Sequence, residues 1–147
     1  MFRPLGASLF EVGNRGEQAM PHLQSTLVEV KRVQGKGRGV FARTDIPKGT
    51  IIERVPVVIL PVREVFGSGP RTRLAEYAFA WGPDKMAIAC GYGSLYNHSY
   101  TPNARFYVDG PASQVFAAIR NIRSGEEVTV NYDGRPRAKP LVTFQVA

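Results

Sequence analysis

The sequence contains little of the side-chain chemistry that defines several large protein classes. Its 147 residues include one cysteine, Cys90, and two histidines, His22 and His98. A single cysteine excludes an internal disulfide framework and a cysteine-rich zinc site. No carboxylate stands at metal-ligand spacing from His98. We therefore expect neither a disulfide-stabilised fold nor a metal site.

Long apolar runs are also absent. No stretch approaches the roughly 20 apolar residues that span a bilayer. The N-terminal residues include Arg3 and Arg15 but lack the apolar core and cleavage site of a secretory signal. We therefore expect no membrane association and predict a cytoplasmic location.

Acidic residues are outnumbered by basic ones, 12 against 19, which gives a net charge of +7. Such an excess can indicate a nucleic-acid or acidic-protein partner. Here the basic residues are scattered, with higher density only at residues 31–43 and 135–139, and they do not alternate with aromatic residues that could stack on bases. We interpret the charge as a solvated basic surface and expect no direct nucleic-acid substrate.

Glycine and proline are plentiful, with 15 and 11 residues, and they separate short apolar segments. This pattern is typical of many turns and short strands, so we predict a mostly-β domain with little helix. The predicted strands cover residues 27–30, 40–42, 51–60, 74–81, 85–90, 105–108, 115–119 and 128–132. Loops are predicted at 61–73, with room for one helical turn, and at 97–103. Residues 1–25 are expected to form a flexible arm, residues 26–134 the domain and residues 135–147 a tail.

Three segments have compositions that could support chemistry. Residues 35–39 are rich in glycine but lack the spacing of a phosphate-binding loop. Glycine has no Cβ, so the backbone there could approach a ligand closely, or simply form a turn. His98 lies next to Ser99, but a hydrolase would also need a separate acid and a presented serine, so we do not expect hydrolysis. Residues 125–132 place two acids in a turn, followed by a strand that ends on Tyr132.

Taken in order, these segments resemble the SET-domain family of protein-lysine methyltransferases. Residues 35–42, GKGRGVFA, are similar to the first cofactor motif of that family. Residues 91–103, GYGSLYNHSYTPN, contain its N-H-S-x-x-P-N motif, and residues 125–132, GEEVTVNY, match its G-E-E-[LV]-x-x-x-Y signature. The resemblance covers about residues 26–134. It implies a β-clip-like SET fold of short-stranded sheets, in which the C-terminal strand passes under the N-H-S loop in a rare, knot-like crossing.

The resemblance also implies a cofactor, S-adenosylmethionine, and the residues that hold it. Asn97 is expected to contact its amino-acid end, and His98 its adenine, largely through the backbone, so that His98 is not a base. The backbone positions expected to hold the amino-acid end are Lys36, Gly37, Arg38 and Gly39.

Tyr132 matches the family's catalytic tyrosine, and the lysine channel beside it is expected to have an aromatic wall. Phe106 and Tyr77 are the candidates for this wall. A phenylalanine at the Phe106 position leaves room for bulkier methylated lysines, which favours di- or trimethylation. The expected partner is a protein that presents a lysine, such as a histone-like, ribosomal or nucleoid protein. Acids that attract this lysine are expected among Asp84, Asp109, Glu126 and Glu127.

The sequence departs from many family members after Tyr132. Only residues 134–147 follow, without the cysteines of the zinc cluster that many eukaryotic members carry there. No zinc is therefore expected, and residues 141–144 are expected to close the lysine channel instead. Two alternatives remain open: a catalytically idle SET-like module that binds a peptide or cofactor, and a small β-clip substrate-binding domain that resembles residues 39–52 alone. The second leaves residues 97–103 and 125–132 unexplained.

Overall fold

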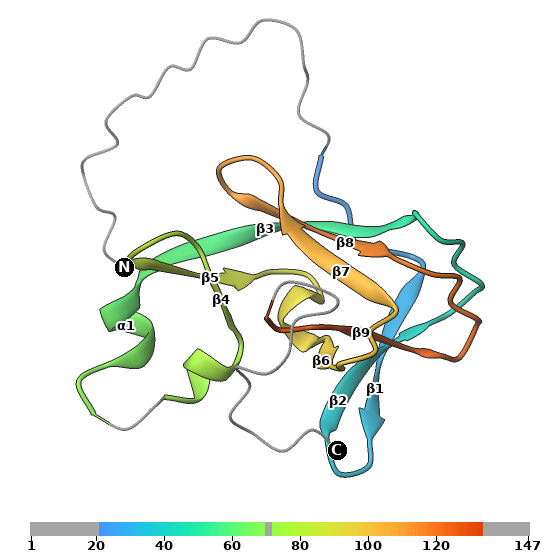
Figure 1. The fold of residues 1–147 in the computed structure, drawn as a ribbon, viewed down its shortest axis with the longest axis horizontal. Coiled ribbons are helices and arrows are strands. Elements are labelled where there is room, and N and C mark those ends of the chain that lie inside the picture. Colours follow the sequence, from blue (N-terminus) through green and yellow to red (C-terminus); the bar gives the residue numbers. More distant parts are fainter. Residues whose placement is uncertain (1–20, 70–71, 134–147) are drawn as a thin grey trace, which may run out of the picture.

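Two curled β-sheets make up most of the computed structural model, which describes residues 21–69 and 72–133 (Figure 1). The four-stranded sheet has the order β1-β2-β9-β6, and the five-stranded sheet the order β4-β5-β3-β8-β7. The first sheet comprises β1 (Val28–Val33), β2 (Gly37–Ala42), β9 (Glu127–Val130) and β6 (Asn97–His98). The second comprises β4 (Ala78–Ala80), β5 (Lys85–Ala89), β3 (Ile51–Pro61), β8 (Ser113–Ala118) and β7 (Ala104–Val108).

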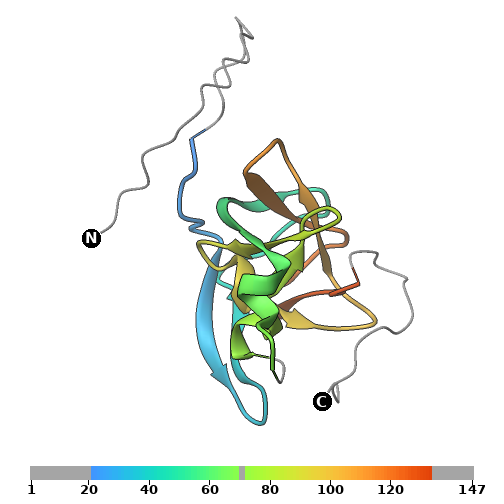
Figure 2. The same cartoon turned by 90° about the vertical axis from the view of Figure 1, so that its left-hand side faces the viewer.

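Helical segments are short in this part of the chain. They are the α-helix α1 (Val62–Phe66) and the 3-10 helices η1 (Arg73–Glu76) and η2 (Gly93–Leu95). None of the described helices is long enough to cross a membrane. The mostly-β fold with little helix is therefore confirmed. The β1–β2 hairpin projects at the lower edge of the molecule in both views (Figures 1 and 2).

Three predicted elements differ from the structure. The strand predicted at 74–81 is wrong in its first half, because the Thr72 side chain accepts a hydrogen bond from the backbone N–H of Ala75 and caps η1. Only Ala78–Ala80 is a strand. The loop predicted at 97–103 begins with the two-residue strand β6. The strand predicted to reach Tyr132 ends at Val130.

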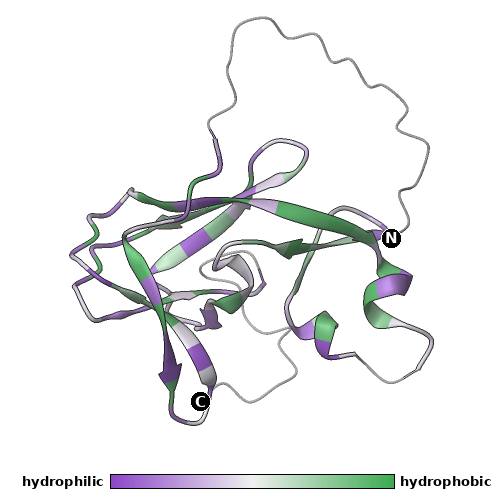
Figure 3. Ribbon diagram, turned by 180° about the vertical axis from the view of Figure 1, so that it is seen from behind, coloured by the Kyte–Doolittle hydropathy of each residue, from purple (hydrophilic) through white to green (hydrophobic). Residues whose placement is uncertain are grey.

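The core is built around β8, which is buried along its whole length between β3 and β7. Phe116 of β8 is completely buried, and its ring stacks on that of Tyr96 with centroids 4.4 Å apart. Phe79 and Phe106 contact the Phe116 ring at centroid distances of 6.2 and 6.1 Å. Apolar residues also continue along β3 (Figure 3). This aromatic cluster holds the segment before β6 against the five-stranded sheet.

Of the predicted arm, residues 21–25 lie within the described part, and three of them contact the domain. His22 lies 2.8 Å from the Ser113 hydroxyl, Gln24 donates to the Tyr92 hydroxyl at 2.8 Å, and Ser25 donates to the Ile52 carbonyl at 2.6 Å. The rest of the arm, the tail at 135–147 and the channel closure expected from residues 141–144 lie outside the described residues.

Gly93 is packed so tightly against the aromatic cluster that a side chain has no room. A Cβ there would lie 2.6 Å from the Ala89 Cβ and 3.0 Å from the Phe116 ring. We expect Gly93→Ala to lower the free energy of unfolding by about 1–3 kcal/mol, as overpacking does in a dense core. The matched control is Gly69→Ala, because a Cβ at Gly69 would meet nothing within 4 Å. Urea unfolding measures both variants, and equal stabilities would contradict this description of the core.

Candidate functional site

The parallel pairing of β6 with β9 brings two of the three predicted motifs together. Asn97 lies opposite Thr129 and His98 opposite Val130, and the N–H of Ser99 donates to the Val130 carbonyl at 3.0 Å. On its other side β9 pairs with β2, which follows the glycine-rich turn. The last strand therefore lies between the first and second motifs. The C-terminal strand and the N-H-S segment thus lie side by side, and the knot-like crossing that the resemblance implies stays a prediction.

Asn103 holds β9 in this position through its side-chain amide. The amide nitrogen donates to the Glu127 carbonyl at 2.7 Å, and the amide oxygen accepts the Thr129 N–H at 2.9 Å. The side chain is almost completely buried. Asn103 was included in the second motif, but no role was predicted for it. Its partners are not adjacent in sequence, so only the motif itself could have indicated it.

Asn97 connects all three motifs. Its amide nitrogen donates to the Arg38 carbonyl at 3.0 Å and to the Glu127 carboxylate at 2.7 Å. Gly39 makes this approach possible, because a Cβ there would lie 2.6 Å from the Glu127 carboxylate and 3.0 Å from the Asn97 amide nitrogen. Gly39 is thus needed for the packing of β2 against Asn97, in addition to any contact of its backbone with a ligand.

His98 fixes the backbone of Tyr132. Its ring is buried, and its Nδ1 atom accepts the Tyr132 N–H at 3.0 Å, which places the ring proton of the neutral form on Nε2. Burial lowers the pKa of His98, although the charge of Asp133 opposes this effect. The ring also contacts Tyr132 edge-on, with centroids 5.1 Å apart. In this state Nδ1 serves as a hydrogen-bond acceptor for the backbone.

Tyr132 donates its phenol proton to the Tyr96 carbonyl at 2.6 Å. Burial raises the pKa of Tyr132 to about 12, and the neighbouring Tyr77 and Glu127 contribute to the increase. The phenol is therefore protonated at neutral pH and acts as a hydrogen-bonding group instead of a base. Its oxygen is held in one place by a backbone atom of the segment that precedes β6.

A cavity of about 360 Å³ opens beside Tyr132. Its lining residues come from the glycine-rich turn, η1 and the residue after it, η2, β6 and the segment that follows β9. They are Lys36, Gly37, Arg38, Glu76, Tyr77, Ser94, Leu95, Asn97 and Tyr132.

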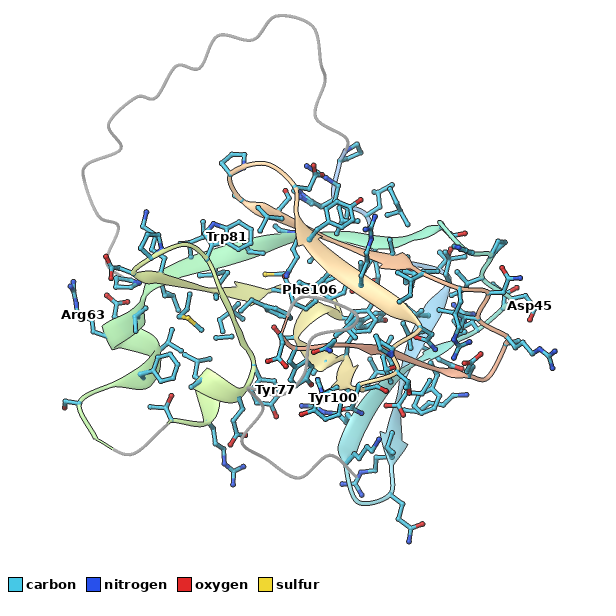
Figure 4. All side chains as sticks on the ribbon, viewed as in Figure 1. Asp45, Arg63, Tyr77, Trp81, Tyr100 and Phe106 are labelled. Atoms are coloured by element: carbon cyan, nitrogen blue, oxygen red, sulfur yellow. The ribbon has the colours of Figure 1, made fainter. Side chains whose placement is uncertain are left out.

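The cavity thus brings together six of the nine predicted site residues. Tyr77, one of these six, follows η1 (Figure 4). Its carbonyl accepts a hydrogen bond from the Ser94 hydroxyl at 3.0 Å.

The other three predicted residues support the cavity from outside its lining. Gly39 packs closely against the Asn97 amide. His98 accepts a hydrogen bond from the Tyr132 backbone N–H. Phe106 points into the aromatic cluster, where its ring meets Phe79 edge-on at 4.8 Å. Glu76, Ser94 and Leu95 also line the cavity but were not predicted from the sequence. Ser94 and Leu95 lie within the second motif segment, whereas no local signal distinguished Glu76.

Comparison with known proteins decides the family. The chain matches the SET domain over residues 37–133. The protein belongs to the SET-domain family. It is 35% identical over 114 residues, 77% of each chain, to a Schizosaccharomyces pombe protein named histone-lysine N-methyltransferase, H3 lysine-37 specific. These matches place it among the protein-lysine N-methyltransferases.

Two further relatives support the SET assignment. N-lysine methyltransferase KMT5A-A of Danio rerio is 26% identical over 123 residues, which are 74% of this chain and 36% of that protein. This chain therefore spans about a third of that relative. A crystal structure of a proposed histone methyltransferase from Plasmodium falciparum superposes with a TM-score of 0.61 at 29% identity, covering 75% of this chain and 94% of the other. The SET fold inferred from the sequence is confirmed.

Within residues 21–69 and 72–133 of this SET domain, no group of three His, Cys, Asp or Glu side chains could hold a metal ion. Three of the four acids expected to attract a lysine have an ion-pair or hydrogen-bond partner within the domain. Glu126 pairs with Arg120, Asp109 with Arg54, and Glu127 with the Asn97 amide. Glu76 is the carboxylate that lines the cavity instead.

The buried His98 ring makes the stability of the SET domain sensitive to acid. Because its pKa in the folded state lies below the usual 6.5, the unfolded chain takes up a proton at higher pH than the folded one. The contribution of the neutral ring is complete above pH 6.5 and is lost as the pH falls through the lower folded-state pKa. Urea unfolding at neutral pH and at about pH 5 should therefore show a loss of stability that is smaller in His98→Asn. The control is His22→Asn, which replaces an exposed histidine. If His98→Asn lost as much stability between neutral pH and about pH 5 as the unmodified protein, the lowered pKa of His98 would be contradicted.

Proposed function

We propose that the protein uses S-adenosylmethionine to methylate a lysine side chain of another protein, and that the reaction takes place in the cavity beside Tyr132. The observation that carries the proposal is the hydrogen bond that holds the Tyr132 phenol on the Tyr96 carbonyl, next to a cavity that residues 36–38 also line. A neutral phenol and a carbonyl can orient a methyl group without reacting with it.

The cavity fits the chemistry of this cofactor. Its volume lies within the range of small-molecule sites. Gly37 has a φ of 84° and open space at its Cβ position, so a ligand can approach the backbone there. Lys36 and Arg38 line the cavity and can attract the carboxylate of the cofactor's amino-acid end. When bound, the cofactor supplies a methyl group on a positively charged sulfur.

Asn97 and His98 have different proposed parts in cofactor binding. Asn97 lines the cavity, which supports the proposed contact with the amino-acid end. His98 is not among the residues that line the cavity, and its ring binds the Tyr132 N–H. Its proposed backbone contact with the adenine therefore stays a prediction. Gly39 contributes by leaving room for Asn97.

The lysine must reach the methyl group as a neutral amine. Free lysine titrates near pH 10.4, so the neutral form costs about 4.6 kcal/mol at pH 7. Desolvation in a narrow channel and a neighbouring positive charge both lower this cost. Tyr132 is itself protonated and His98 already accepts the Tyr132 N–H through Nδ1. We therefore propose that water carries the proton away.

Glu76 offers a way for a basic protein to accept a basic side chain. The chain carries a net charge of +7, which repels a lysine-rich segment. Glu76 lines the cavity together with Tyr77, and its carboxylate can attract the lysine ammonium group before its proton is lost. Tyr77 would then form part of the channel wall.

Alignment of the reacting groups supplies the remaining part of the catalysis. Correct orientation of two reactants can lower a barrier by roughly 7–11 kcal/mol. The Tyr132 oxygen and the Tyr96 carbonyl can both accept weak C–H···O contacts, which are stronger when the methyl group carries positive charge. Tyr132 is thus the proposed catalytic residue.

The proposed substrate is a protein that presents an exposed lysine, with a histone as the first candidate. Two relatives carry histone methyltransferase in their names, which supports this choice. Ribosomal and nucleoid proteins present similar lysine-rich segments and belong in the same screen. The cytoplasmic location stays a prediction, as does the absence of nucleic-acid substrates and of membrane contact.

Replacement of Tyr132 tests the proposal directly. Purified protein, incubated with labelled S-adenosylmethionine and a mixture of histones and lysine peptides, should transfer label to lysine. Tyr132→Phe removes the hydroxyl that orients the methyl group and should lower the transfer rate on the order of a hundredfold. Calorimetry should show that the variant still binds the cofactor.

The control for this experiment is Tyr107→Phe, which removes the hydroxyl of an exposed tyrosine on β7. Cofactor binding without any transfer by the unmodified protein would favour the idle SET-like module instead. Absence of cofactor binding would contradict the proposal altogether.

Phe106 is proposed to set the number of methyl groups. Its ring packs with Phe79 and Phe116, and Phe116 stacks on Tyr96, whose carbonyl holds Tyr132. A phenylalanine leaves space that a tyrosine hydroxyl would fill, so the unmodified enzyme should yield di- or trimethyllysine. Mass spectrometry should show a shift toward monomethyllysine in Phe106→Tyr and none in Tyr107→Phe. An unchanged product distribution would make Phe106 a core residue only.

A further inference from the structure

Glu53 is a buried carboxylate that takes no part in the chemistry proposed above. It lies on β3, next to a shift of register against β8, and its side chain is only 4% exposed. Carboxylates are rarely buried to this degree without a partner, because loss of hydration is costly. Burial accordingly raises the pKa of Glu53. Its position therefore requires an explanation.

Tyr96 is the partner of Glu53. The Tyr96 hydroxyl donates to the Glu53 carboxylate at 3.0 Å, and both residues are buried. The Tyr92 N–H also approaches the second carboxylate oxygen, at the longer distance of 3.5 Å. The Tyr96 ring is stacked on Phe116 at the same time. The side chain of Tyr96 is therefore held at its hydroxyl and across its ring.

The backbone of Tyr96 carries the carbonyl that accepts the Tyr132 phenol proton. Tyr96 lies between η2, which ends at Leu95, and β6, which begins at Asn97. The β6–β9 register starts at Asn97, so strand pairing does not include Tyr96. Because the Tyr96 carbonyl shares a planar peptide unit with the Asn97 N–H, its orientation depends on the start of β6 on one side and on the anchored Tyr96 side chain on the other.

The turn at Gly91, which leads to Tyr96, is closely packed against Glu53. A Cβ at Gly91 would lie 2.7 Å from the Val55 side chain and 3.2 Å from the Glu53 carboxylate. Gly91 has a φ of 59°, which glycine adopts readily. The turn before η2 is thus packed directly on the carboxylate that holds Tyr96.

We propose that Glu53 and Tyr96 are positioning residues, and that the hydrogen bond between their side chains fixes the carbonyl that orients the Tyr132 phenol. The chain of contacts runs from the Glu53 carboxylate through the Tyr96 hydroxyl, ring and carbonyl to the Tyr132 oxygen. Its consequence for methyl transfer rests on the proposed function, whereas its effect on the Tyr132 phenol does not.

Stability alone is a weak reason for such a pair. Replacement of two buried, hydrogen-bonded polar groups by apolar groups of similar shape is often nearly neutral for stability, while removal of one partner is destabilising. A buried polar pair is better explained where it specifies one geometry. Here the geometry that it specifies is that of the Tyr96 carbonyl.

Four variants test the proposal by kinetics. Tyr96→Phe keeps the ring stack but removes the hydroxyl, and Glu53→Leu removes the acceptor. Both should lower kcat on the order of tenfold and leave the KM for the cofactor within about twofold, because the cofactor contacts lie elsewhere. Glu53→Gln keeps an oxygen that can accept the Tyr96 proton, so it should retain kcat within about threefold of the unmodified enzyme.

The double variant Tyr96→Phe with Glu53→Leu separates positioning from stability. It removes both members of the hydrogen-bonded side-chain pair and otherwise loses the long contact of the Tyr92 N–H, so it should unfold at a urea concentration closer to that of the unmodified protein than either single variant does. Its kcat should nevertheless be as low as that of either single variant, because one shared interaction has been lost. A kcat restored to the unmodified value would overturn the proposal. So would a Glu53→Gln enzyme as slow as Glu53→Leu.

A spectroscopic measurement tests the same geometry without turnover. In protein labelled with ¹³C at the tyrosine Cζ atoms, the signal of Tyr132 is assigned by its loss in Tyr132→Phe. This signal should move in Glu53→Leu and in the double variant, because the hydrogen bond of its phenol changes, and should stay in place in Tyr107→Phe. If the unmodified protein transferred no methyl group, the proposed function would fail, and a moved Tyr132 signal would still support the positioning role. A Tyr132 signal unaffected by both variants would overturn it.

Discussion

The hydrogen bond from the Tyr132 phenol to the Tyr96 carbonyl is the contact on which the site depends. It joins Tyr132, which lies just beyond the end of β9, to Tyr96, which comes directly before β6. Little regular strand pairing holds these two parts of the chain together. β6 has two residues, and a parallel ladder of that length contributes little by itself. Side chains complete the connection: Asn103 binds the β9 backbone, and His98 binds the Tyr132 backbone. The junction between β9 and the N-H-S segment is therefore stabilised mainly by polar side chains of the second motif.

Burial gives the same residues their chemical character. The Tyr132 pKa is raised to about 12 and the His98 pKa is lowered, so both groups are neutral at physiological pH. A neutral phenol and a neutral imidazole are suited to positioning and unsuited to removing a proton from an ammonium group. The charged groups at the cavity are Lys36, Arg38 and Glu76. This division, with neutral groups beside the reacting atoms and charges at the walls, fits a methyl transfer whose main requirements are alignment and desolvation.

Much of this arrangement could be predicted from the sequence, because the informative signals were local. Strands were predicted at residues 105–108 and 115–119, and the structure has β7 and β8 there, joined by a turn in which Gly110 has a positive φ of 75°. The three motifs contributed five of the six predicted residues that line the cavity, and Tyr77 is the sixth. The sequence could not show β6, because two residues that pair with a strand about 30 positions away leave no periodic pattern. It also gave no sign that Glu53 is buried, since a charged residue in an apolar strand usually faces solvent and its partner Tyr96 lies 43 residues away.

A crystal structure of the protein with the demethylated cofactor and a lysine peptide tests the central claim most directly. The account predicts cofactor density in the cavity lined by Lys36, Gly37 and Asn97, and the lysine amine next to a Tyr132 phenol that still donates to the Tyr96 carbonyl. Cofactor density at another surface, or a Tyr132 ring turned away from both ligands, would contradict it.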